Sequence, residues 1–453
     1  MKRVLLLLSA ACSQPAAPEA WPLSSDGTHL RDAVGRIALL RGVNVRAQGV
    51  FDVTFDDGRT ALEAIPEITQ QDFFRMRELG FTLVRLPINW SALAPERGTL
   101  DEPYLDRVNA LVDEAALAEL FVLIDIHQDA YSKEIGEDGA PLWAIQPPPQ
   151  MLLQGPLTDL DARRTSPEVT AAFDTFFDKA DAAGLQKDFL FALGRVAERW
   201  ADNASVIGFE IFNEPPVGED LVDTFQFAAA ERVHAKAPTK LVMFEPSAVR
   251  NLFDFVPKAT APFPVPNAVY APHVYTYVFY SDQTQLQNLT ADALEPSVQA
   301  ARAEATSWNT PLMIGEYGIG PEQPNADLWM GAQAMLHDRY LASDAFWLWK
   351  EASQGAWGVF DHAGDVWTER PQVVAWISRV HAARIAGDVI ANDYDLTARS
   401  LHLETHGSSV AHSIYVPSDS FTATCNDVAI AAPRDASTGL VELACDGVLV
   451  VSP

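Results

Sequence analysis

Eight short apolar runs between residues 37 and 350 constrain the fold of this chain more than any other feature of its sequence. Each run is at most eight residues long, and nearly all of its residues are hydrophobic. A strand that is covered on both faces, as in a parallel sheet, has such a continuous run instead of an alternating one. The eight predicted strands are Ile37–Asn44, Thr82–Pro87, Phe121–His127, Val206–Asn213, Leu241–Glu245, Val269–His273, Pro311–Glu316 and Ala345–Trp349.

Longer segments with helical periodicity separate these runs. They include Asp72–Leu79, Tyr104–Glu119, Leu185–Trp200, Asp220–Ala235 and Asp327–Leu341. Repeated strand–helix units over this length predict an α/β fold of the (β/α)8, or TIM, barrel class. A doubly wound open sheet is the alternative, but no glycine-rich phosphate-binding loop follows the first run.

The pattern divides the chain into three parts. Residues 1–20 form a signal peptide or tether, residues 21–384 the barrel, and residues 385–453 a small antiparallel β-sandwich. The last part has short alternating runs broken by Gly, Asn, Asp and Pro, which are typical of such a sandwich. An insertion at residues 128–183 follows the third strand, on the face where barrel enzymes place their sites. We expect it to form either part of a substrate-binding wall or a surface loop.

The N-terminus resembles a bacterial lipoprotein signal peptide. Two basic residues, Lys2 and Arg3, precede the apolar run Val4–Ala11, which ends before Cys12. The sequence therefore predicts a bacterial exported protein that is secreted, periplasmic or held at the outer membrane by a lipid on Cys12. An ordinary secretory signal is the alternative interpretation.

The other two cysteines, Cys425 and Cys445, lie in the predicted sandwich. In an oxidising compartment an even pair that closes a short loop is expected to form a disulfide, the alternative being two unrelated buried thiols.

Charge and motif content exclude several classes of protein. The chain has 61 acidic and 32 basic residues, a formal net charge of −29, which repels phosphate backbones and argues against a nucleic-acid partner. Its ten histidines are scattered, and the sequence has neither a His-Glu-x-x-His motif nor a cysteine cluster. It also lacks the Gly-x-Ser-x-Gly elbow of serine hydrolases. We therefore predict no metal and no cofactor, and we expect a monomer.

Polar residues stand at the ends of most of the predicted strands. In a barrel, such residues at the carboxyl ends of strands face the substrate, because the strand interior is filled with aliphatic side chains. The residues at these positions are Asn44, Arg85, His127, Gln128, Asp129, Asn213, Glu214, His273, Tyr275, Glu316, Trp347 and Trp349.

Two carboxylates at these ends, Glu214 and Glu316, suit the hydrolysis of a glycosidic bond. One carboxyl protonates the departing oxygen, and a second attacks the anomeric carbon from about 5–5.5 Å away in retaining enzymes. A single strand-end glutamate is usually a helix cap or an ion-pair partner. The presence of both glutamates at strand ends, with Glu214 flanked by Asn213 and Pro215, favours the catalytic interpretation.

The motifs Ile211–Pro215 and Ile314–Gly318 resemble those of family 5 of the glycoside hydrolases, which are retaining barrel glycosidases. The resemblance covers roughly residues 37 to 380. Within that family, Arg41–Val45, Asp125–Asp129 and Phe346–Lys350 look most like endoglycoceramidases and related glycolipid glycosidases, which also carry a small C-terminal β domain.

The resemblance implies that Glu214 is the general acid/base and Glu316 the nucleophile. We expect the charge on Glu316 to raise the pKa of Glu214. Arg85 and Tyr275 are suited to keep Glu316 ionised, Asn213 to bind a sugar 2-hydroxyl, and His273 to tune Glu214. His127 and Asp129 are expected to bind hydroxyls of the first sugar, and Trp347 to stack on it. The simpler alternatives are an ion pair for Arg85, a core position for His127 and a turn cap for Asp129.

These residues predict a retaining β-glycosidase that acts on glycosphingolipids and releases either an intact oligosaccharide or single sugars. The substrate is then a glycolipid or glycan, and the protein meets the membrane through that substrate or through a lipid anchor. The alternatives are an endo-β-glucanase or mannanase on soluble polysaccharide, and a non-catalytic glycan- or glycolipid-binding surface protein. The segment Arg46–Gln48 matches no sugar-contacting position of the subfamily, so the sugar identity stays open. The aromatic run from Tyr275 to Tyr280 either forms an apolar wall for a lipid tail or packs internally.

Overall fold

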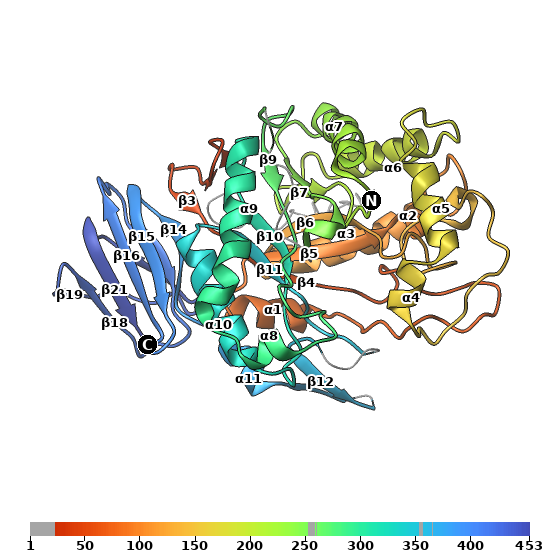
Figure 1. Ribbon diagram of the computed structural model, residues 1–453. Helices are drawn as coiled ribbons and strands as arrows, with labels where there is room; N and C mark the ends of the chain where they lie inside the picture. Colours follow the sequence, from red (N-terminus) through yellow and green to blue (C-terminus); the bar gives the residue numbers. More distant parts are fainter. Residues whose placement is uncertain (1–22, 252–258, 260, 353–356, 365) are drawn as a thin grey trace, which may run out of the picture.

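Eight parallel strands form the central sheet of the computed structural model, which describes residues 23–453 apart from 252–258, 260, 353–356 and 365 (Figure 1). The predicted signal peptide and Cys12 lie outside these residues. The strand order is β10-β11-β4-β5-β6-β7-β8-β9. The strands are β4 (Arg41–Asn44), β5 (Leu83–Asn89), β6 (Phe121–His127), β7 (Val206–Glu210), β8 (Leu241–Phe244), β9 (Ala268–Tyr270), β10 (Met313–Tyr317) and β11 (Ser343–Phe346).

The two edges of this sheet meet, so the sheet is a closed barrel. The amide of Tyr270 donates to the carbonyl of Pro311 at 3.0 Å, and the amide of Val274 donates to that of Glu316 at 2.9 Å. These bonds join β9 to β10. Each of the eight predicted runs contributes a strand, and the predicted (β/α)8 class is confirmed.

Helices surround the barrel, as the sequence periodicity predicts (Figure 1). Helix α3 illustrates the local cause: Asp101 caps it by accepting from the Tyr104 amide at 3.0 Å, and its apolar stripe, including Val108 and Val112, is buried. The helices are α1 (Gln70–Glu78), α2 (Trp90–Leu93), α3 (Glu102–Leu117), η1 (Leu142–Ala144), α4 (Leu160–Arg164), α5 (Pro167–Phe176), α6 (Leu185–Arg199), α7 (Glu219–Lys236), η2 (Ala248–Asn251), α8 (Thr284–Gln287), η3 (Ala291–Leu294), α9 (Glu295–Trp308), α10 (Ala326–Arg339) and α11 (Pro371–Ile377).

The insertion at residues 128–183 contains η1, α4 and α5. A two-stranded hairpin, β12 (Phe360–Ala363) with β13 (Val366–Glu369), precedes α11. No helix in the described part of the chain is both long and apolar enough to span a bilayer.

The first predicted strand differs from the structure, because Ile37–Asn44 serves two sheets. Ile37–Ala38 is β3 and pairs antiparallel with β14 (His381–Ile385), whereas only Arg41–Asn44 joins the barrel. Leu39 belongs to the core of the sandwich and Leu40 to the interior of the barrel. The run is continuously apolar because it passes between these two cores.

Two antiparallel sheets make up the sandwich, which lies beside the barrel (Figure 1). It begins at His381 and includes three N-terminal strands, so it is discontinuous in sequence, unlike the predicted segment 385–453. Its six-stranded sheet has the order β1 (Ser24–Ser25), β2 (Leu30–Arg31), β3, β14, β17 (His412–Tyr415) and β20 (Leu440–Leu443). Its five-stranded sheet has the order β15 (Asp388–Asp395), β16 (Ser400–His406), β21 (Gly447–Ser452), β18 (Thr422–Cys425) and β19 (Val428–Ile430).

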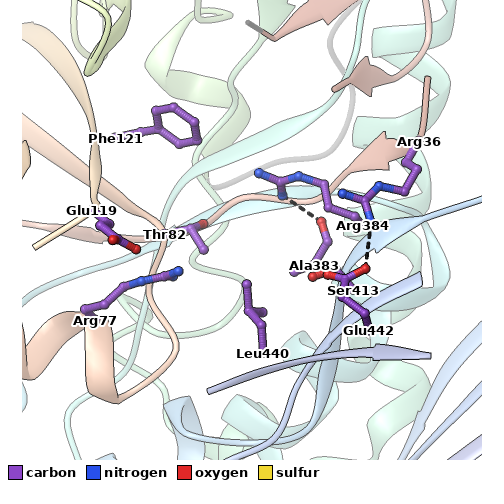
Figure 2. Close-up of a pocket in the computed structure, with 10 residues that line it drawn as sticks. All are labelled: Arg36, Arg77, Thr82, Glu119, Phe121, Ala383, Arg384, Ser413, Leu440 and Glu442. Carbon is purple, nitrogen blue, oxygen red and sulfur yellow. Dashed lines mark hydrogen bonds and ion pairs between the residues drawn. The ribbon is translucent and has the colours of Figure 1, made fainter. Parts of the chain in front are cut away.

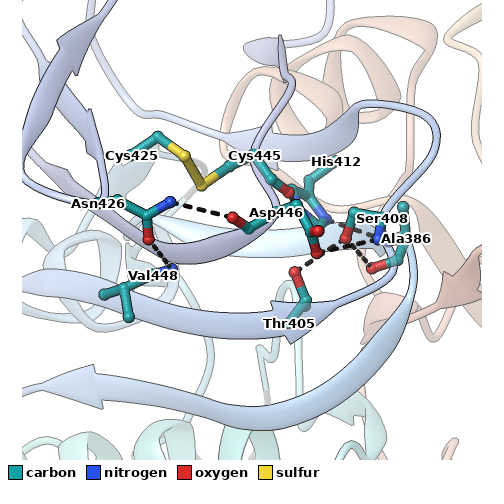
Figure 3. Close-up of a disulfide and its surroundings, with 9 residues drawn as sticks. All are labelled: Ala386, Thr405, Ser408, His412, Cys425, Asn426, Cys445, Asp446 and Val448. Atoms are coloured by element: carbon teal, nitrogen blue, oxygen red, sulfur yellow. Dashed lines mark hydrogen bonds between the residues drawn. A yellow bond between two sulfur atoms is a disulfide. The ribbon is translucent and has the colours of Figure 1, made fainter.

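The predicted disulfide between Cys425 and Cys445 is present (Figure 3). Cys425 ends β18 of the five-stranded sheet, and Cys445 follows β20 of the six-stranded sheet. Cys445 lies in the turn that leads from β20 to β21 of the five-stranded sheet, so the bond joins the end of β18 to the connection between the two sheets.

Candidate active site

The predicted site residues meet at the carboxyl ends of the barrel strands. Arg85 lies on β5, His127 ends β6, and Glu316 lies on β10. Loops that follow strands supply the others: Asp129, Asn213, Glu214, His273, Tyr275 and Trp347. Glu214 has a backbone φ of 44°, in the left-handed region, which non-glycine residues rarely adopt and which is enriched at functional sites.

Glu214 and Glu316 are close enough to act on one bond. An oxygen of each carboxyl and a ring nitrogen of His273 all lie within 4.8 Å of one another. This separation is near the roughly 5–5.5 Å between the carboxyls of retaining glycosidases. The Glu214 side chain is 24% exposed and that of Glu316 is 7% exposed, so Glu214 is the more accessible of the two.

Two donors hold the carboxylate of Glu316. Nη1 of Arg85 donates to Oε1 at 2.7 Å, and the hydroxyl of Tyr275 donates to Oε2 at 2.8 Å. Burial raises the pKa of Glu316, and the positive charges of His273 and Arg85 oppose that rise. Arg85 and Tyr275 through their hydrogen bonds, and His273 through its charge, therefore favour the ionised form of Glu316.

Arg85 is fully buried and is not an ion pair at the rim of the barrel. Besides Glu316, it donates to both carboxylate oxygens of Glu210, at 2.7 and 2.9 Å. It also donates to the side-chain oxygens of Asn44 and Asn213, each at 2.8 Å. Burial alone would raise the pKa of Glu210, but Arg85 lowers it to about 2. Because its guanidinium is fixed by so many acceptors, Arg85 orients the side chains of Glu316 and Asn213 at the floor of the site.

Glu214 is held by His273 and Asn251. Nδ1 of His273 lies 2.7 Å from Oε1, and Nδ2 of Asn251 donates to the same oxygen at 2.8 Å. Burial favours the neutral carboxyl, but the hydrogen bond and charge of His273 lower the pKa of Glu214 to about 2. Burial lowers the pKa of His273, whereas Glu316 and Glu214 raise it, and the net shift is upward.

The expectation that Glu316 would raise the pKa of Glu214 is therefore wrong for the substrate-free site. The reason is His273, whose hydrogen bond and charge lower the pKa of Glu214. The pKa of His273 is raised and that of Glu214 is lowered, and the two side chains lie within hydrogen-bond distance of one another.

Glu245 is a further buried carboxyl that the sequence interpretation missed. Its Oε1 accepts from the backbone amide of Glu214 at 3.2 Å and lies 3.5 Å from Nε2 of His273. Burial and the neighbouring Glu210 raise the pKa of Glu245 well above its usual range. The fifth predicted run ends at Glu245, so the strand-end rule contained the signal for it.

The predicted sugar-binding residues line the same end of the barrel. Nδ1 of His127 lies 2.6 Å from Asp125, which leaves Nε2 for a substrate hydroxyl, and its ring is nearly parallel to that of Trp347 with centroids 5.8 Å apart. Asp129 accepts from Nε of Arg164 at 2.8 Å, so its carboxylate is ion-paired with the last residue of α4, farther along the same insertion. Nδ2 of Asn213 donates to the carbonyl of Gln128 at 3.0 Å and has a second hydrogen to donate.

A cluster of aromatic side chains lies beside Glu316. The ring of Tyr275 is 5.0 Å from that of Phe279 and 6.2 Å from that of Trp357. Phe279 is 56% exposed, so the predicted aromatic run is partly a surface feature. Trp349, in contrast, is fully buried and donates to Asp72 at 2.9 Å, which makes it a core residue.

Two sets of side chains in the described part of the chain have a spacing that a metal ion could use. They are Glu214, His273 and Glu316, and Glu210, Glu245 and His273. Glu316 and Glu210 are already bonded to Arg85, so we interpret both sets as one hydrogen-bonded network.

The barrel and this network define a glycosidase-type site, and comparison with known proteins identifies the family. The model of the cellulase family, glycosyl hydrolase family 5, matches residues 46–353. The chain belongs to this family, as its motifs predicted.

Several relatives are named for glycolipid substrates. Endoglycoceramidase I of Rhodococcus hoagii is 32% identical over 330 residues, which cover 68% of this chain and 64% of that protein. A glucosylceramidase of Cryptococcus neoformans is 27% identical over 247 residues, or 43% of this chain and 33% of that protein. The match thus spans less than two thirds of the length of either relative.

Solved structures share the whole fold. An endogalactoceramidase superposes with a TM-score of 0.77 and 23% identity, covering 95% of this chain and 99% of that chain. Endoglycoceramidase II of a Rhodococcus species, in complex with a ganglioside, superposes with a TM-score of 0.76 and 21% identity, covering 94% of this chain and 99% of that chain. These likenesses extend over both the barrel and the sandwich.

Proposed function

We propose that this protein is a retaining β-glycosidase that cleaves the bond between the sugar and the lipid of a glycosphingolipid. The observation that carries the proposal is the closeness of Glu214 and Glu316, with oxygens within 4.8 Å and with different partners. A guanidinium and a phenol suit a nucleophile, and a histidine suits a group that exchanges a proton.

In the first step, an oxygen of Glu316 attacks the anomeric carbon while the bond to the lipid oxygen breaks. The proton shared between His273 and Glu214 passes to that oxygen, so the lipid leaves as a neutral alcohol. In the second step, Glu214 accepts a proton from water, the water oxygen attacks the anomeric carbon, and Glu316 is released. The site returns to its starting protonation.

The preference for a glycolipid rests on the aromatic group of Tyr275, Phe279 and Trp357. It gives the site an apolar side next to Glu316, where a lipid chain is better accommodated than another hydroxyl-rich sugar. The names of the relatives point the same way. A soluble β-glucan is the second candidate, because the family model is that of cellulases.

A product analysis separates these substrates. The protein is incubated with lactosylceramide, glucosylceramide, a ganglioside and carboxymethyl-cellulose, with Glu316→Gln as the inactive control. We expect ceramide from every lipid, with intact lactose from lactosylceramide, the intact oligosaccharide from the ganglioside and glucose from glucosylceramide. Cleavage of glucosylceramide with no release of lactose or of the ganglioside oligosaccharide would assign a glycosylceramidase, and cleavage of cellulose alone would contradict the glycolipid proposal.

We also propose that the protein is exported and works as a monomer, with a lipid on Cys12 holding it at a membrane. The support is the sequence of residues 1–20. Replacement of Cys12 by Ser should release the protein from the membrane fraction of the cell, whereas an unchanged distribution would contradict the anchor.

A further inference from the structure

A pocket lies between the barrel and the sandwich (Figure 2). Its lining residues Thr82 and Phe121 stand where β5 and β6 begin, at the opposite end of the barrel from Glu214 and Glu316. Its volume is about 450 Å³, including its open mouth. The barrel contributes Arg77 and Thr82, and the six-stranded sheet contributes Arg384 and Ser413. The pocket is therefore separate from the candidate active site.

Arginines gather around this pocket in a chain whose net charge is −29. Arg36 is neutralised, since it contacts Asp32 at 2.8 Å and Glu442 at 3.0 Å. Arg384 differs, because no carboxylate of the described residues lies within 4.0 Å of it. The charges of Asp32 and Glu442 act on its guanidinium, but neither carboxylate forms an ion pair with it.

Arg384 is also buried. It is 6% exposed, its Nη1 donates at 2.7 Å to the carbonyl of the adjacent Ala383, and its Nε is buried without an acceptor. Burial lowers the pKa of Arg384 to about 10; the charges of Asp32 and Glu442 oppose this shift, and those of Arg36 and Arg77 reinforce it. A buried cation with one hydrogen bond is unfavourable unless a further group neutralises it.

We propose that this pocket binds a small oxyanion, with the guanidinium of Arg384 as its principal ligand. A planar guanidinium pairs with two oxygens of a phosphate, sulfate or carboxylate group at once. The hydroxyl of Ser413, which has no hydrogen bond among the described residues, is a second donor at the wall. Glu119 and Glu442 also line the pocket, so it accepts one compact anion and disfavours a long polyanion.

An anion in this position would join the barrel to the sandwich, since its neighbours come from both. Binding to the folded protein alone raises the unfolding temperature in proportion to the logarithm of ligand concentration. The effect of an occupied site is therefore measurable without any assay of glycosidase activity.

The test measures thermal unfolding of the full chain in phosphate, sulfate, acetate and chloride at equal ionic strength. We expect a saturable rise with at least one oxyanion and none with chloride. Arg384→Met should abolish the rise, and a calorimetric titration should show binding weakened at least tenfold. In chloride the variant should be at least as stable as the natural protein, because methionine fills the space without a buried charge.

Arg195→Met serves as the matched control, because this arginine is exposed on α6, and it should keep the full response. If Arg384→Met does not fold, Arg384→Lys replaces it and should weaken binding, since the ammonium lacks the planar fork. Equal responses to chloride and oxyanions, or a full response in the Arg384 variants, would overturn the proposal. The relative effects of phosphate, sulfate and acetate identify which oxyanion the pocket prefers.

Discussion

Arg85 and Tyr275 donate to the two carboxylate oxygens of Glu316, whereas Glu214 has a histidine and an amide as its partners. A guanidinium stays charged at every working pH, so it favours the ionised form of Glu316, as the proposed nucleophile requires. A histidine exchanges its proton near neutrality, so it favours a carboxyl that alternates between acid and base. The two glutamates thus differ in role through their neighbours.

Replacing each glutamate by glutamine tests these roles. We expect Glu316→Gln to lower turnover by about 10³-fold or more on every β-glycoside, because no nucleophile remains. Glu214→Gln should lower kcat/KM, which reports the first step alone, by about 10²–10⁴-fold on substrates with poor leaving groups and far less on dinitrophenyl glycosides, whose leaving group needs no proton. Steady-state kinetics with both substrates measure this, with the exposed Glu198→Gln as control. Equal losses on both substrates for Glu214→Gln would contradict its role as the acid.

The pH dependence of kcat/KM tests the proton on His273. As pH increases, kcat/KM should rise when Glu316 ionises and fall when His273 loses its proton. Since the pKa values of both groups are raised, the rising limb should lie above the ordinary pKa of glutamate and the falling limb above that of histidine. In His273→Asn the falling limb should move to lower pH, because the proton must then reside on Glu214 itself. His234→Asn, a half-buried histidine on α7, should leave the profile unchanged. An unchanged falling limb in His273→Asn would show that this proton is not the one used.

At the scale of elements, the barrel strands follow directly from the sequence, because burial on both faces produces a continuous apolar run. The polar residues that end these runs were predictable for the same reason, since side chains at the strand ends leave the packed interior. The division of Ile37–Asn44 between β3 and β4 was not predictable locally. Both halves are apolar, and only their pairing with β14 and β5 separates them.

The disulfide between β18 and the end of β20 can be tested at this scale. The bridged residues are 20 positions apart. Closing a loop of this length removes entropy from the unfolded chain and so raises the free energy of unfolding by about 3 kcal/mol. The double variant Cys425→Ser, Cys445→Ser should therefore unfold at lower denaturant concentration while keeping its activity at 25 °C. Denaturant unfolding followed in parallel with activity measures both effects. An unchanged midpoint would contradict a stabilising role for the bond.

At the scale of the whole molecule, the sandwich and the barrel pack closely at the end of α1. A Cβ built on Gly80 would lie 2.7 Å from the ring of Tyr415 on β17, and the hydroxyl of Tyr415 donates to the carbonyl of Glu78 at 2.8 Å. Gly80 also has a positive φ of 96°. The glycine is required by both its backbone conformation and this contact between the two parts.

Two glycine variants separate these requirements. Gly98 has a φ of 80°, and no residue beyond its chain neighbours lies within 4 Å of the position that an added Cβ would take. Gly98→Ala should therefore lower the free energy of unfolding by about 1 kcal/mol, through backbone strain alone. Gly80→Ala carries the same strain and also displaces Tyr415, so we expect an additional loss of about 1–3 kcal/mol of unfolding free energy. Chemical denaturation of both variants measures the difference. Equal losses would mean that the contact adjusts without strain.

The sequence by itself determined the barrel, the helices around it, the paired cysteines and the strand-end residues, because each depends on local burial or on residue type. Only the tertiary structure decided which charges are neighbours. His273 lies between Glu214 and Glu245, with one ring nitrogen near each carboxyl, and residues 24–38 pair with strands of the sandwich. Electrostatic shifts and sheet pairing depend on distances between segments far apart in the chain, and a local pattern contains no such distances.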